Sequence, residues 1–464
     1  MTDKNVEMAR RVARAVAAAG GRTYYVGGFV RDRLLGRDNK DVDVEVHGIS
    51  VRALEGVLDG LGERLAMGES FGIMGLRHYD LDIAMPRGDR TADRGCRELE
   101  AGVNPFVGPE RAARRRDFTI NALMEDVLSG EVLDFFGGRD DLARGRIRHV
   151  DSSTFVEDSL RVLRAAQFAA RFGFEVAPET RELCATLDLA ELAGERIFGE
   201  LAKALLKAEH PSVFFEELRR MGQLDVWFAE VEALVGVTQN QRYHPEGDVW
   251  THTMQVVDRA AVMRERSKDA LGLMLAAVCH DFGKASARQE VNGVVHAYGH
   301  EIEGVPLARR FLGRMTRERQ LASYVANMVE LHMRPNQLVA NGSRAKKYMH
   351  LFDASVCPMD LLLLARVDHE GRVSADGLMR PVDYAPIEET LRRMLAEYDR
   401  RMALPYATGR DLVEAGFAPG PAFGEALTYA HKLRLAGRPK EDQIASAVAI
   451  LRKGERTSVR PSMA

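Results

Sequence analysis

Residues 23–46 read TYYVGGFVRDRLLGRDNKDVDVEV and contain two strand-like segments on either side of a helix-like one. The first segment, TYYV, ends at the pair Gly27-Gly28, after which FVRDRLLG has the composition of a short helix. In residues 41–46, acidic residues alternate with valines, and this period of two is typical of a half-buried strand. The stretch therefore predicts a strand, a turn, a helix and a second strand, which is the beginning of an α/β fold.

The flanking patterns extend this prediction in both directions. Residues 5–19 have helical periodicity and stop at Gly20-Gly21, and residues 72–85 form a second alternating stretch. Strand-like patterns end near residue 150, and from Glu157 onward apolar residues recur with helical spacing. We therefore expect an α+β protein, with a small α/β head followed by a long all-α body.

Length and composition set the broad class. The chain has 464 residues, and about 150 residues per domain predicts roughly three packed units. An apolar share of 46% and a charged share of 29% exclude a disordered chain. The longest apolar runs, such as residues 271–279, are shorter than the ~18 residues that span a bilayer, so we expect no membrane segment.

The ends and the cysteines point to the cytoplasm. The N-terminus, MTDKNVEMARR, has no apolar stretch behind its charges, so we expect no signal peptide. The 4 cysteines lie far apart and form no C-x-x-C, which argues against a disulfide framework and a thiolate zinc site. The cytoplasm is therefore the expected compartment.

Acidic residues on two of the predicted strands suggest a metal site. Residues i and i+2 of a strand point to the same face, so Asp41 and Asp43 are predicted to lie side by side. A third carboxylate, Asp82 or Asp80, lies on the next alternating stretch. Three carboxylates on neighbouring strands suit two Mg²⁺ ions that promote in-line attack on a nucleotide α-phosphate. A solvated polar face on an edge strand is the alternative interpretation.

Two further motifs suit phosphate binding. A glycine pair between a strand and a helix, as at Gly27-Gly28, lets backbone N–H groups approach a phosphate at the helix N-terminus. The segment RRRDFTINA at 114–122 combines three arginines with polar residues that suit phosphate or ribose contact. Each motif alone is also found in ordinary turns and solvated basic loops.

In this order, G-G-x-V-R-D, D-x-D and R-R-D-F-T-I-N-A resemble motifs of the class II tRNA nucleotidyltransferase family, which includes CCA-adding enzymes and bacterial poly(A) polymerases. Three later segments resemble the same family, namely DFFGGRDDL at 134–142, EDSLRVLR at 157–164 and ERIFGEL at 195–201. The resemblance implies a nucleotidyltransferase head that transfers nucleotides to the 3′ end of tRNA.

The resemblance also implies roles for single residues. Asp41 and Asp43 would be catalytic and bind Mg²⁺, with Asp82 as the supporting carboxylate. The other implied residues bind the nucleotide, and they are Gly27, Gly28, Arg31, Arg115, Asp117, Asn121, Asp158, Arg161 and Arg164.

In this set, Asp158 and Arg161 would recognise the incoming base. They are three residues apart in a predicted helix and would share a face. A carboxylate acceptor and a guanidinium donor together can mimic a Watson–Crick edge for cytosine or adenine. An ordinary intrahelical ion pair is the alternative interpretation.

The charge distribution agrees with an RNA partner despite a formal net charge of only −3. Phosphate binding depends on where the cations lie, and arginines gather in residues 111–116, 139–148 and 161–171. We expect a basic stripe on the head and the helices that follow it. Because aromatic residues are sparse among these arginines, we expect recognition of a folded RNA and its 3′ end, which for this family is tRNA.

A second constellation lies in the predicted body. The segments VWTHTMQVV (249–257) and LAAVCHDFGK (275–284), with later histidines and Asp368, resemble the HD-domain phosphohydrolase superfamily. Imidazoles and carboxylates are good ligands for divalent metals. The resemblance implies a divalent metal such as Mg²⁺, Mn²⁺ or Ni²⁺ held by four ligands, which are His252, His280, Asp281 and Asp368.

Two more histidines, His300 and His332, would complete a second HD metal site or bind phosphate. Some relatives with this domain remove phosphate from 2′- or 2′,3′-cyclic phosphate ends, which suits repair of a damaged tRNA terminus. A degenerate or purely structural HD fold is the alternative.

The resemblance covers nearly the whole chain and suggests four domains. These are a nucleotidyltransferase head (1–150), a helical neck and body with the base-recognition helix and RNA-binding surface (151–243), an HD domain (244–380) and a C-terminal helical tail (381–464).

The function expected is template-independent addition of CCA to tRNA from CTP and ATP. The long segment 86–113 resembles the flexible loop that full CCA-adding enzymes need to switch to ATP. The alternatives are an A-adding or CC-adding enzyme, a poly(A) polymerase, and an HD phosphohydrolase or RNA-binding protein with an idle head. A monomer and a dimer are both compatible with the sequence.

Overall fold

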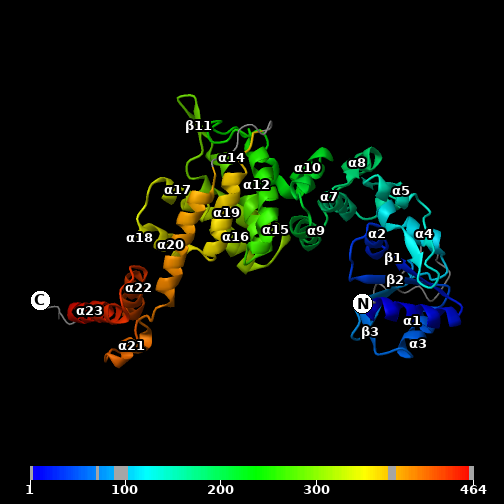
Figure 1. Cartoon of the computed structure of the whole chain (residues 1–464), viewed down its shortest axis with the longest axis horizontal. Helices are drawn as coiled ribbons and strands as arrows, with labels where there is room; N and C mark the ends of the chain where they lie inside the picture. Colours follow the sequence, from blue (N-terminus) through cyan, green and yellow to red (C-terminus); the bar gives the residue numbers. More distant parts are fainter. Residues whose placement is uncertain (1–3, 69–72, 88–102, 375–382, 459–464) are drawn as a thin grey trace, which may run out of the picture. The chain divides into compact units, whose positions relative to one another are not determined.

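The computed structural model describes residues 4–68, 73–87, 103–374 and 383–458. Their contacts divide the chain into two compact units. The first unit comprises Met1–Ala204 and Val213–Trp227, and the second comprises Leu205–Ser212 and Phe228–Ala464. Figure 1 shows the elements of both units, coloured along the sequence.

The first unit is built on a seven-stranded mixed sheet with the order β3-β4-β5-β2-β1-β6-β7. Its strands are β1 (Arg22–Val26), β2 (Val42–His47), β3 (Arg64–Gly68), β4 (Ile73–Leu76), β5 (Leu81–Ala84), β6 (Met124–Asp126) and β7 (Val132–Leu133). The strands predicted in residues 23–26 and 41–46 are therefore confirmed. The predicted α+β class is also confirmed.

The second alternating stretch is a hairpin and not one strand. β4 and β5 pair antiparallel, and the turn between them has His78 at φ 73°. The alternation continues across the turn, so the sequence pattern alone does not mark the break. The hairpin puts β5 beside β2, with which it pairs in parallel.

Helices cover the sheet of the first unit. α1 (Lys4–Ala18) confirms the predicted N-terminal helix and packs against β1, β2 and α3 (Val51–Asp59). On β2 the three valines are at most 1% exposed, and this apolar face lies in the core. Burying such side chains contributes about 1.5–3 kcal/mol each, which fixes the register of the strand and hence the face on which its acidic residues lie.

The remaining helices of this unit follow the sheet. They are α2 (Gly28–Leu34), α4 (Pro109–Arg114), α5 (Gly138–Ala143), α6 (Ser152–Phe155), α7 (Leu160–Phe172), α8 (Pro178–Ala185), α9 (Gly194–Lys207), α10 (Ser212–Arg220) and α11 (Leu224–Glu232), and α9 to α11 extend across the border between the units. A two-stranded parallel pair, β8 (Arg146–Ile147) with β9 (Glu175–Val176), lies among them.

The second unit is almost entirely helical. Its central helices pack against one another, and they are α12 (Val249–Met263), α13 (Ala270–Cys279), α15 (His300–Met315), α16 (Arg319–Leu331) and α19 (Pro358–Glu370). α13 is buried over nearly its full length, because its sequence ALGLMLAAVC has no charged residue. Shorter elements connect these helices, namely α14 (Lys284–Ala287), β10 (Gln289–Val291), β11 (Val294–His296), α17 (Arg334–Ala340) and α18 (Ala345–Ala354).

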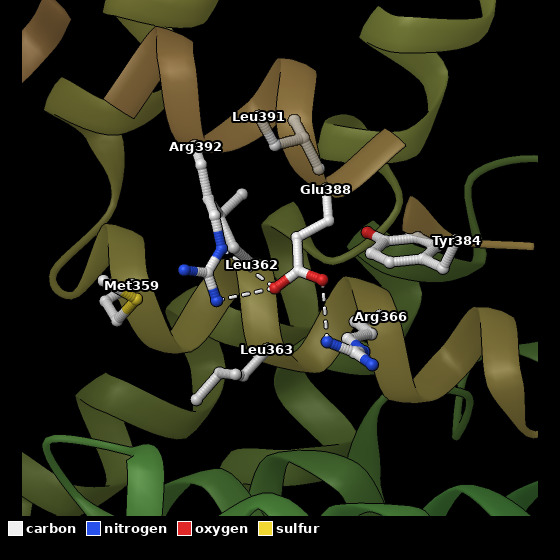
Figure 2. A pocket seen from close by; sticks show the side chains of 8 residues that line it. All are labelled: Met359, Leu362, Leu363, Arg366, Tyr384, Glu388, Leu391 and Arg392. Atoms are coloured by element: carbon white, nitrogen blue, oxygen red, sulfur yellow. Dashed lines mark hydrogen bonds and ion pairs between the residues drawn. The ribbon is translucent and has the colours of Figure 1, made fainter. Parts of the chain in front are cut away.

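The long helix α20 (Ala385–Ala403) is joined to α19 by the ion pair of Glu388 with Arg366, and Glu388 also pairs with Arg392 within α20 (Figure 2). Arg366 of α19 lies 2.8 Å from one oxygen of Glu388, and Arg392 lies 2.7 Å from the other. Beyond α20, a small core of its own holds α21 (Gly409–Glu414), α22 (Ala422–Leu435) and α23 (Lys440–Ser458) together.

Two predictions from the sequence fall partly outside the described residues. Most of the segment 86–113 is not described, since the structure begins again at Val103 after Arg87. The predicted border between residues 380 and 381 also lies outside them. Among the described helices, no single one is long and apolar enough to cross a bilayer, although α18 and α19, bent by 106°, together meet the length and composition criteria.

Candidate functional site

The three carboxylates predicted to be catalytic belong to two neighbouring interior strands of the sheet, or directly precede one of them. Asp43 of β2 and Asp82 of β5 are directly paired in the parallel register. Asp41 stands immediately before β2 and is exposed. Parallel strands bring paired side chains on one face close together, so Asp43 lies beside Asp82, and Asp41 directly precedes the same strand as Asp43.

The electrostatics of this group favour a cation. Partial burial, together with the charges of Asp82 and Asp41, raises the pKa of Asp43 from 3.8 to about 6. Burial and the charges of Asp80 and Asp41 also raise the pKa of Asp82. Clustered carboxylates repel one another, and a divalent cation bound between them would relieve that repulsion. The donor set is therefore of the kind that suits a divalent cation.

Gly27 and Arg116 lie next to the carboxylate of Asp43. Gly27 has φ +64° at the start of α2, a conformation that L side chains rarely adopt. A Cβ at Gly27 would lie 3.2 Å from Nη1 of Arg116 and 4.0 Å from Oδ2 of Asp43. Arg116 donates to Glu45 at 3.1 Å, and its charge counteracts the rise in the pKa of Asp43. The sequence indicated all three arginines of residues 114–116, and the resemblance singled out Arg115 and not Arg116.

Four of the predicted nucleotide-binding residues form one buried network. Arg31 donates to Asp32 at 2.8 Å and to Asn121 at 2.5 Å, and Asn121 donates to Asp117 at 3.0 Å. Arg164 of α7 donates to the other oxygen of Asp117 at 2.7 Å. The network therefore ties the helix after the glycine pair to α7.

This network is held firmly in the core. Although burial alone would raise it, the Arg164 guanidinium and the Asn121 amide hold the pKa of Asp117 below its usual value. The guanidinium of Arg31 lies 4.6 Å from the ring centroid of Phe172 and 5.2 Å from that of Phe168. Arg31 is only 3% exposed, so its guanidinium is engaged by protein groups on several sides.

The structure corrects the prediction for Asp158. Asp158 is not in the helix that contains Arg161, because α7 begins at Leu160 and the Asp158 carboxylate accepts from the N–H of that residue. The same carboxylate pairs with Arg196 at 2.8 Å. Aspartate competes with helical backbone bonds by capping them, which explains the later helix start.

Arg161 is likewise engaged elsewhere and does not pair with Asp158. It donates to the backbone carbonyls of Thr154 and Arg115, at 2.7 Å each. Arg115 itself pairs with Glu157 at 2.6 Å. Asp158 and Arg161 are thus close in the chain, but they do not lie on the same face of one helix as predicted.

In the second unit, six predicted metal-binding residues converge from five helices or their ends. The centre is Asp281, whose Oδ2 lies 3.2 Å from Nε2 of His280 and 3.6 Å from Nε2 of His252. Its Oδ1 lies 3.3 Å from Nε2 of His300 and 3.8 Å from Nε2 of His332. Asp368 closes the cluster, 3.1 Å from Nε2 of His252.

Local hydrogen bonds aim three of these imidazoles at the centre. Nδ1 of His280, His300 and His332 lies 2.7 to 2.8 Å from the carbonyl oxygen three residues earlier. A carbonyl only accepts, so Nδ1 carries the proton and Nε2 presents a lone pair. This is the tautomer of a metal-binding histidine.

The cluster fits a divalent metal in two further respects. Nε2 of His280 is buried without a hydrogen-bond partner, and the buried oxygens of Asp281 have ion-pair contacts but no hydrogen bond of regular geometry. Burial and the neighbouring imidazoles of His280 and His300 lower the pKa of His332 to about 3, so this ring is neutral near pH 7. Metal ligands must be deprotonated, and unsatisfied buried donor atoms are unusual without a ligand.

Two cations neutralise the carboxylates of the cluster. Lys284 lies 2.6 Å from Asp281, and Arg372 lies 3.0 Å from Asp368. Although burial alone would raise them, these cations and the imidazoles hold the pKa values of both carboxyls well below their usual range.

His244 and Glu246 also adjoin the cluster and were missed from the sequence. They precede α12 in the segment HPEGD, where no periodicity or family motif had drawn attention to them. Within the described parts of the chain, the tight groups of potential metal ligands all belong to this cluster or its border with Glu246, and the head carboxylates do not form such a group.

Comparison with protein-family models divides the chain in the same way. The poly A polymerase head domain matches residues 23–148, which contain the carboxylates and the glycine pair. A model described as the probable RNA and SrmB-binding site of polymerase A matches residues 173–234. The HD domain matches residues 249–358.

Solved structures share the fold. A CCA-adding enzyme of Bacillus stearothermophilus in complex with CTP has a TM-score of 0.67 and 21% identity, covering 98% of this chain and 99% of the other. The Thermotoga maritima CCA-adding enzyme complexed with tRNA has a TM-score of 0.62 and 20% identity, covering 96% and 95%.

Sequence relatives are closer. A multifunctional CCA protein of Pasteurella multocida is 38% identical over 71% of this chain and 78% of its own length. One from Nitrosococcus oceani is 35% identical over 87% of this chain and 95% of its own. With the head and HD domains both matched and most of these relatives' length covered, the chain belongs to the multifunctional CCA proteins, a family of CCA tRNA nucleotidyltransferases.

Proposed function

We propose that this protein adds C, C and A to the 3′ end of tRNA, without a nucleic-acid template, from CTP and ATP. The observation that carries the proposal is the pairing of Asp43 with Asp82 beside Asp41, next to a glycine turn and Arg116. The names of its relatives support it, as do the CTP and tRNA bound in structures of the same fold.

In this reaction the terminal ribose hydroxyl of tRNA attacks the α-phosphate of the nucleotide, and pyrophosphate leaves. Asp41, Asp43 and Asp82 would hold two Mg²⁺ ions, which supply charge stabilisation for the attacking and leaving oxygens. Because Gly27 has no side chain, the backbone of the turn can approach the triphosphate closely. Arg116 lies where its guanidinium can bind the same phosphates.

The other head residues are assigned positioning and selection. Arg31, Asn121, Asp117 and Arg164 form the rigid support that joins the glycine turn to α7. Together with Gly28 and Arg115, this support would shape the triphosphate and ribose site.

Base selection requires a rearrangement at Asp158. Its carboxylate is paired with Arg196, so it must release that partner before it can accept from a base. Arg161 is held by two carbonyls and must likewise turn to donate to a base.

We also propose that the HD unit is a phosphohydrolase acting on 2′-phosphate or 2′,3′-cyclic phosphate at the end of tRNA. His252, His280, Asp281 and Asp368 would hold a divalent metal such as Mg²⁺, Mn²⁺ or Ni²⁺, which would activate water for attack on phosphorus. His300 and His332 face the opposite oxygen of Asp281, and they would complete a second metal site or bind the substrate phosphate.

Both proposed activities have tRNA as the macromolecular partner. The cytoplasm remains the expected compartment. The arginines in residues 111–116 and 139–148 would supply cations for phosphate contact.

One incubation tests the main proposal against its alternatives. When it is incubated with tRNA lacking CCA, the protein should add C from CTP alone and the full CCA from CTP and ATP together. Addition of A only onto a CC end identifies an A-adding enzyme, and arrest after CC identifies a CC-adding enzyme. A long run of A identifies a poly(A) polymerase. No incorporation under any condition means that the head is idle.

Paired variants assign each activity to its site. The double change Asp41→Ala, Asp43→Ala should abolish incorporation, whereas Asp38→Asn, at an exposed carboxylate nearby, should leave it unchanged. Survival of incorporation in the double variant contradicts the metal-assisted mechanism.

A matching pair addresses the HD unit. The double change His280→Ala, Asp281→Ala should remove phosphate release and spare CTP incorporation, and His350→Ala, at an exposed histidine, serves as the control. Loss of both activities in the double variant contradicts two independent sites.

A further inference from the structure

Glu246 is a buried carboxylate shared by two histidines at the border of the HD cluster. Its Oε1 lies 2.8 Å from Nδ1 of His252 and 2.8 Å from Nδ1 of His244. Its side chain is fully buried, and Oε2 has no hydrogen-bond partner. Burying a carboxylate is costly unless its charge is compensated. We therefore ask which neighbouring group the negative charge of Glu246 stabilises.

His252 differs from the other imidazoles of the cluster in how it is oriented. His280, His300 and His332 each donate from Nδ1 to a backbone carbonyl three residues earlier. His252 lies in the first turn of α12, where its own N–H bonds to the carbonyl of Asp248. Among the described residues, Nδ1 of His252 makes no hydrogen bond to a carbonyl, and the group closest to it is the carboxylate of Glu246, at 2.8 Å.

The imidazole of His252 therefore lies between the carboxylate of Glu246 and the centre of the HD cluster. With Nδ1 of His252 in this 2.8 Å ion-pair contact with Glu246, Nε2 faces Asp368 at 3.1 Å and Asp281 at 3.6 Å. A carboxylate behind a metal-binding imidazole fixes its tautomer and orientation and makes it a stronger ligand.

We propose that Glu246 is the positioning residue of the HD metal centre and sets its metal affinity through His252. The inference rests on the metal centre proposed above, and it does not depend on which reaction that centre catalyses. Glu246 lies outside the residues matched by the HD-domain model. Removing such an outer carboxylate lowers metal affinity by about 10–100-fold.

The experiment measures binding of Mn²⁺ and of Ni²⁺ alone to the full-length protein by equilibrium dialysis. The double variant His280→Ala, Asp281→Ala supplies the background from the head carboxylates. We expect Glu246→Ala to weaken HD binding by about 100-fold and Glu246→Gln, which keeps an acceptor but loses the charge, by about 10-fold.

Two matched variants separate positioning from general destabilisation. Glu230→Gln changes a buried carboxylate of the same unit that binds Arg310 and Arg314 away from the cluster. It should lower thermal stability and leave metal affinity unchanged. His244→Ala removes the other imidazole at Glu246, and it should change affinity by less than about threefold if Glu246 acts through His252.

The proposal is overturned if Glu246→Gln binds both metals like the wild type, or if Glu230→Gln weakens binding as much as Glu246→Gln. A His244→Ala loss equal to that of Glu246→Ala also overturns it, because Glu246 would then act through His244. If the wild type binds metal but releases no phosphate from any tRNA end, the proposed phosphohydrolase fails while this inference stands.

Discussion

Replacing Asp43 by asparagine should stabilise the head while abolishing its chemistry. Burial and the charges of Asp82 and Asp41 raise the pKa of Asp43 to about 6, so without a cation the folded state pays for ionising this carboxyl. Asparagine has nearly the same shape and no charge. The metal-free head of Asp43→Asn should therefore be more stable than the wild type at pH 8.

The size and the sign of this effect follow from the pKa. A tenfold change in acidity corresponds to about 1.4 kcal/mol, so a rise from 3.8 to about 6 corresponds to at most about 3 kcal/mol. The side chain is partly exposed, and screening reduces the expectation to about 1–2 kcal/mol. Below pH 3.8 the group is protonated in both states and the penalty is absent; it grows as the pH rises to 6 and is complete above that.

Thermal unfolding in EDTA at pH 4 and pH 8 tests this reasoning. At pH 8 the transition of the head in Asp43→Asn should lie about 2–8 °C above that of the wild type, and at pH 4, close to the unfolded pKa of 3.8, the difference should shrink to a small fraction of that. Asp38→Asn, at an exposed carboxylate, should show no difference at either pH. A variant that is less stable at pH 8, or equally stabilised at both values, would refute the electrostatic account.

Three further changes probe single contacts. Arg116→Ala should lower kcat/KM for CTP incorporation by about 100-fold, and wild-type kinetics would remove Arg116 from the phosphate site. Arg164→Ala leaves the buried carboxylate of Asp117 without its guanidinium and should cost about 3–5 kcal/mol in urea unfolding; a loss below about 1 kcal/mol contradicts a buried pair. Gly283→Ala would place a Cβ 2.0 Å from the carbonyl oxygen of His300, so the purified variant should lose HD-bound metal, and unchanged metal content would contradict that close packing.

The sequence patterns predict the head carboxylates well, because a strand imposes a simple rule. The alternation in residues 41–46 fixes which side chains share a face, and the structure has Asp43 opposite Asp82. The HD ligands were found through motifs and not through periodicity. Their convergence depends on packing between helices that are distant in the sequence, which no local pattern encodes.

The missed residues show where local rules stop. Three consecutive arginines have the same local signal, and only the fold shows that Arg116 is the one beside Gly27. Asp158 lay within a helical pattern, yet it precedes α7, and its carboxylate accepts from the N–H of Leu160. Glu246 lies in a loop before α12, where its partner His252 is known only once the chain has folded back.

The hydrogen bonds from Nδ1 of His280 and His332 have a thermodynamic consequence. Both histidines follow the last residue of a helix, α13 and α16, and each occupies a carbonyl of the final turn that the helix itself leaves unpaired. The same hydrogen bond therefore orients the imidazole and satisfies a carbonyl at the end of the helix. Fraying of either end would release an imidazole, and occupancy of the centre would oppose that fraying. Amide hydrogen exchange in the last turns of α13 and α16 should consequently slow when metal is added, so that these helix ends report on the centre without any substrate.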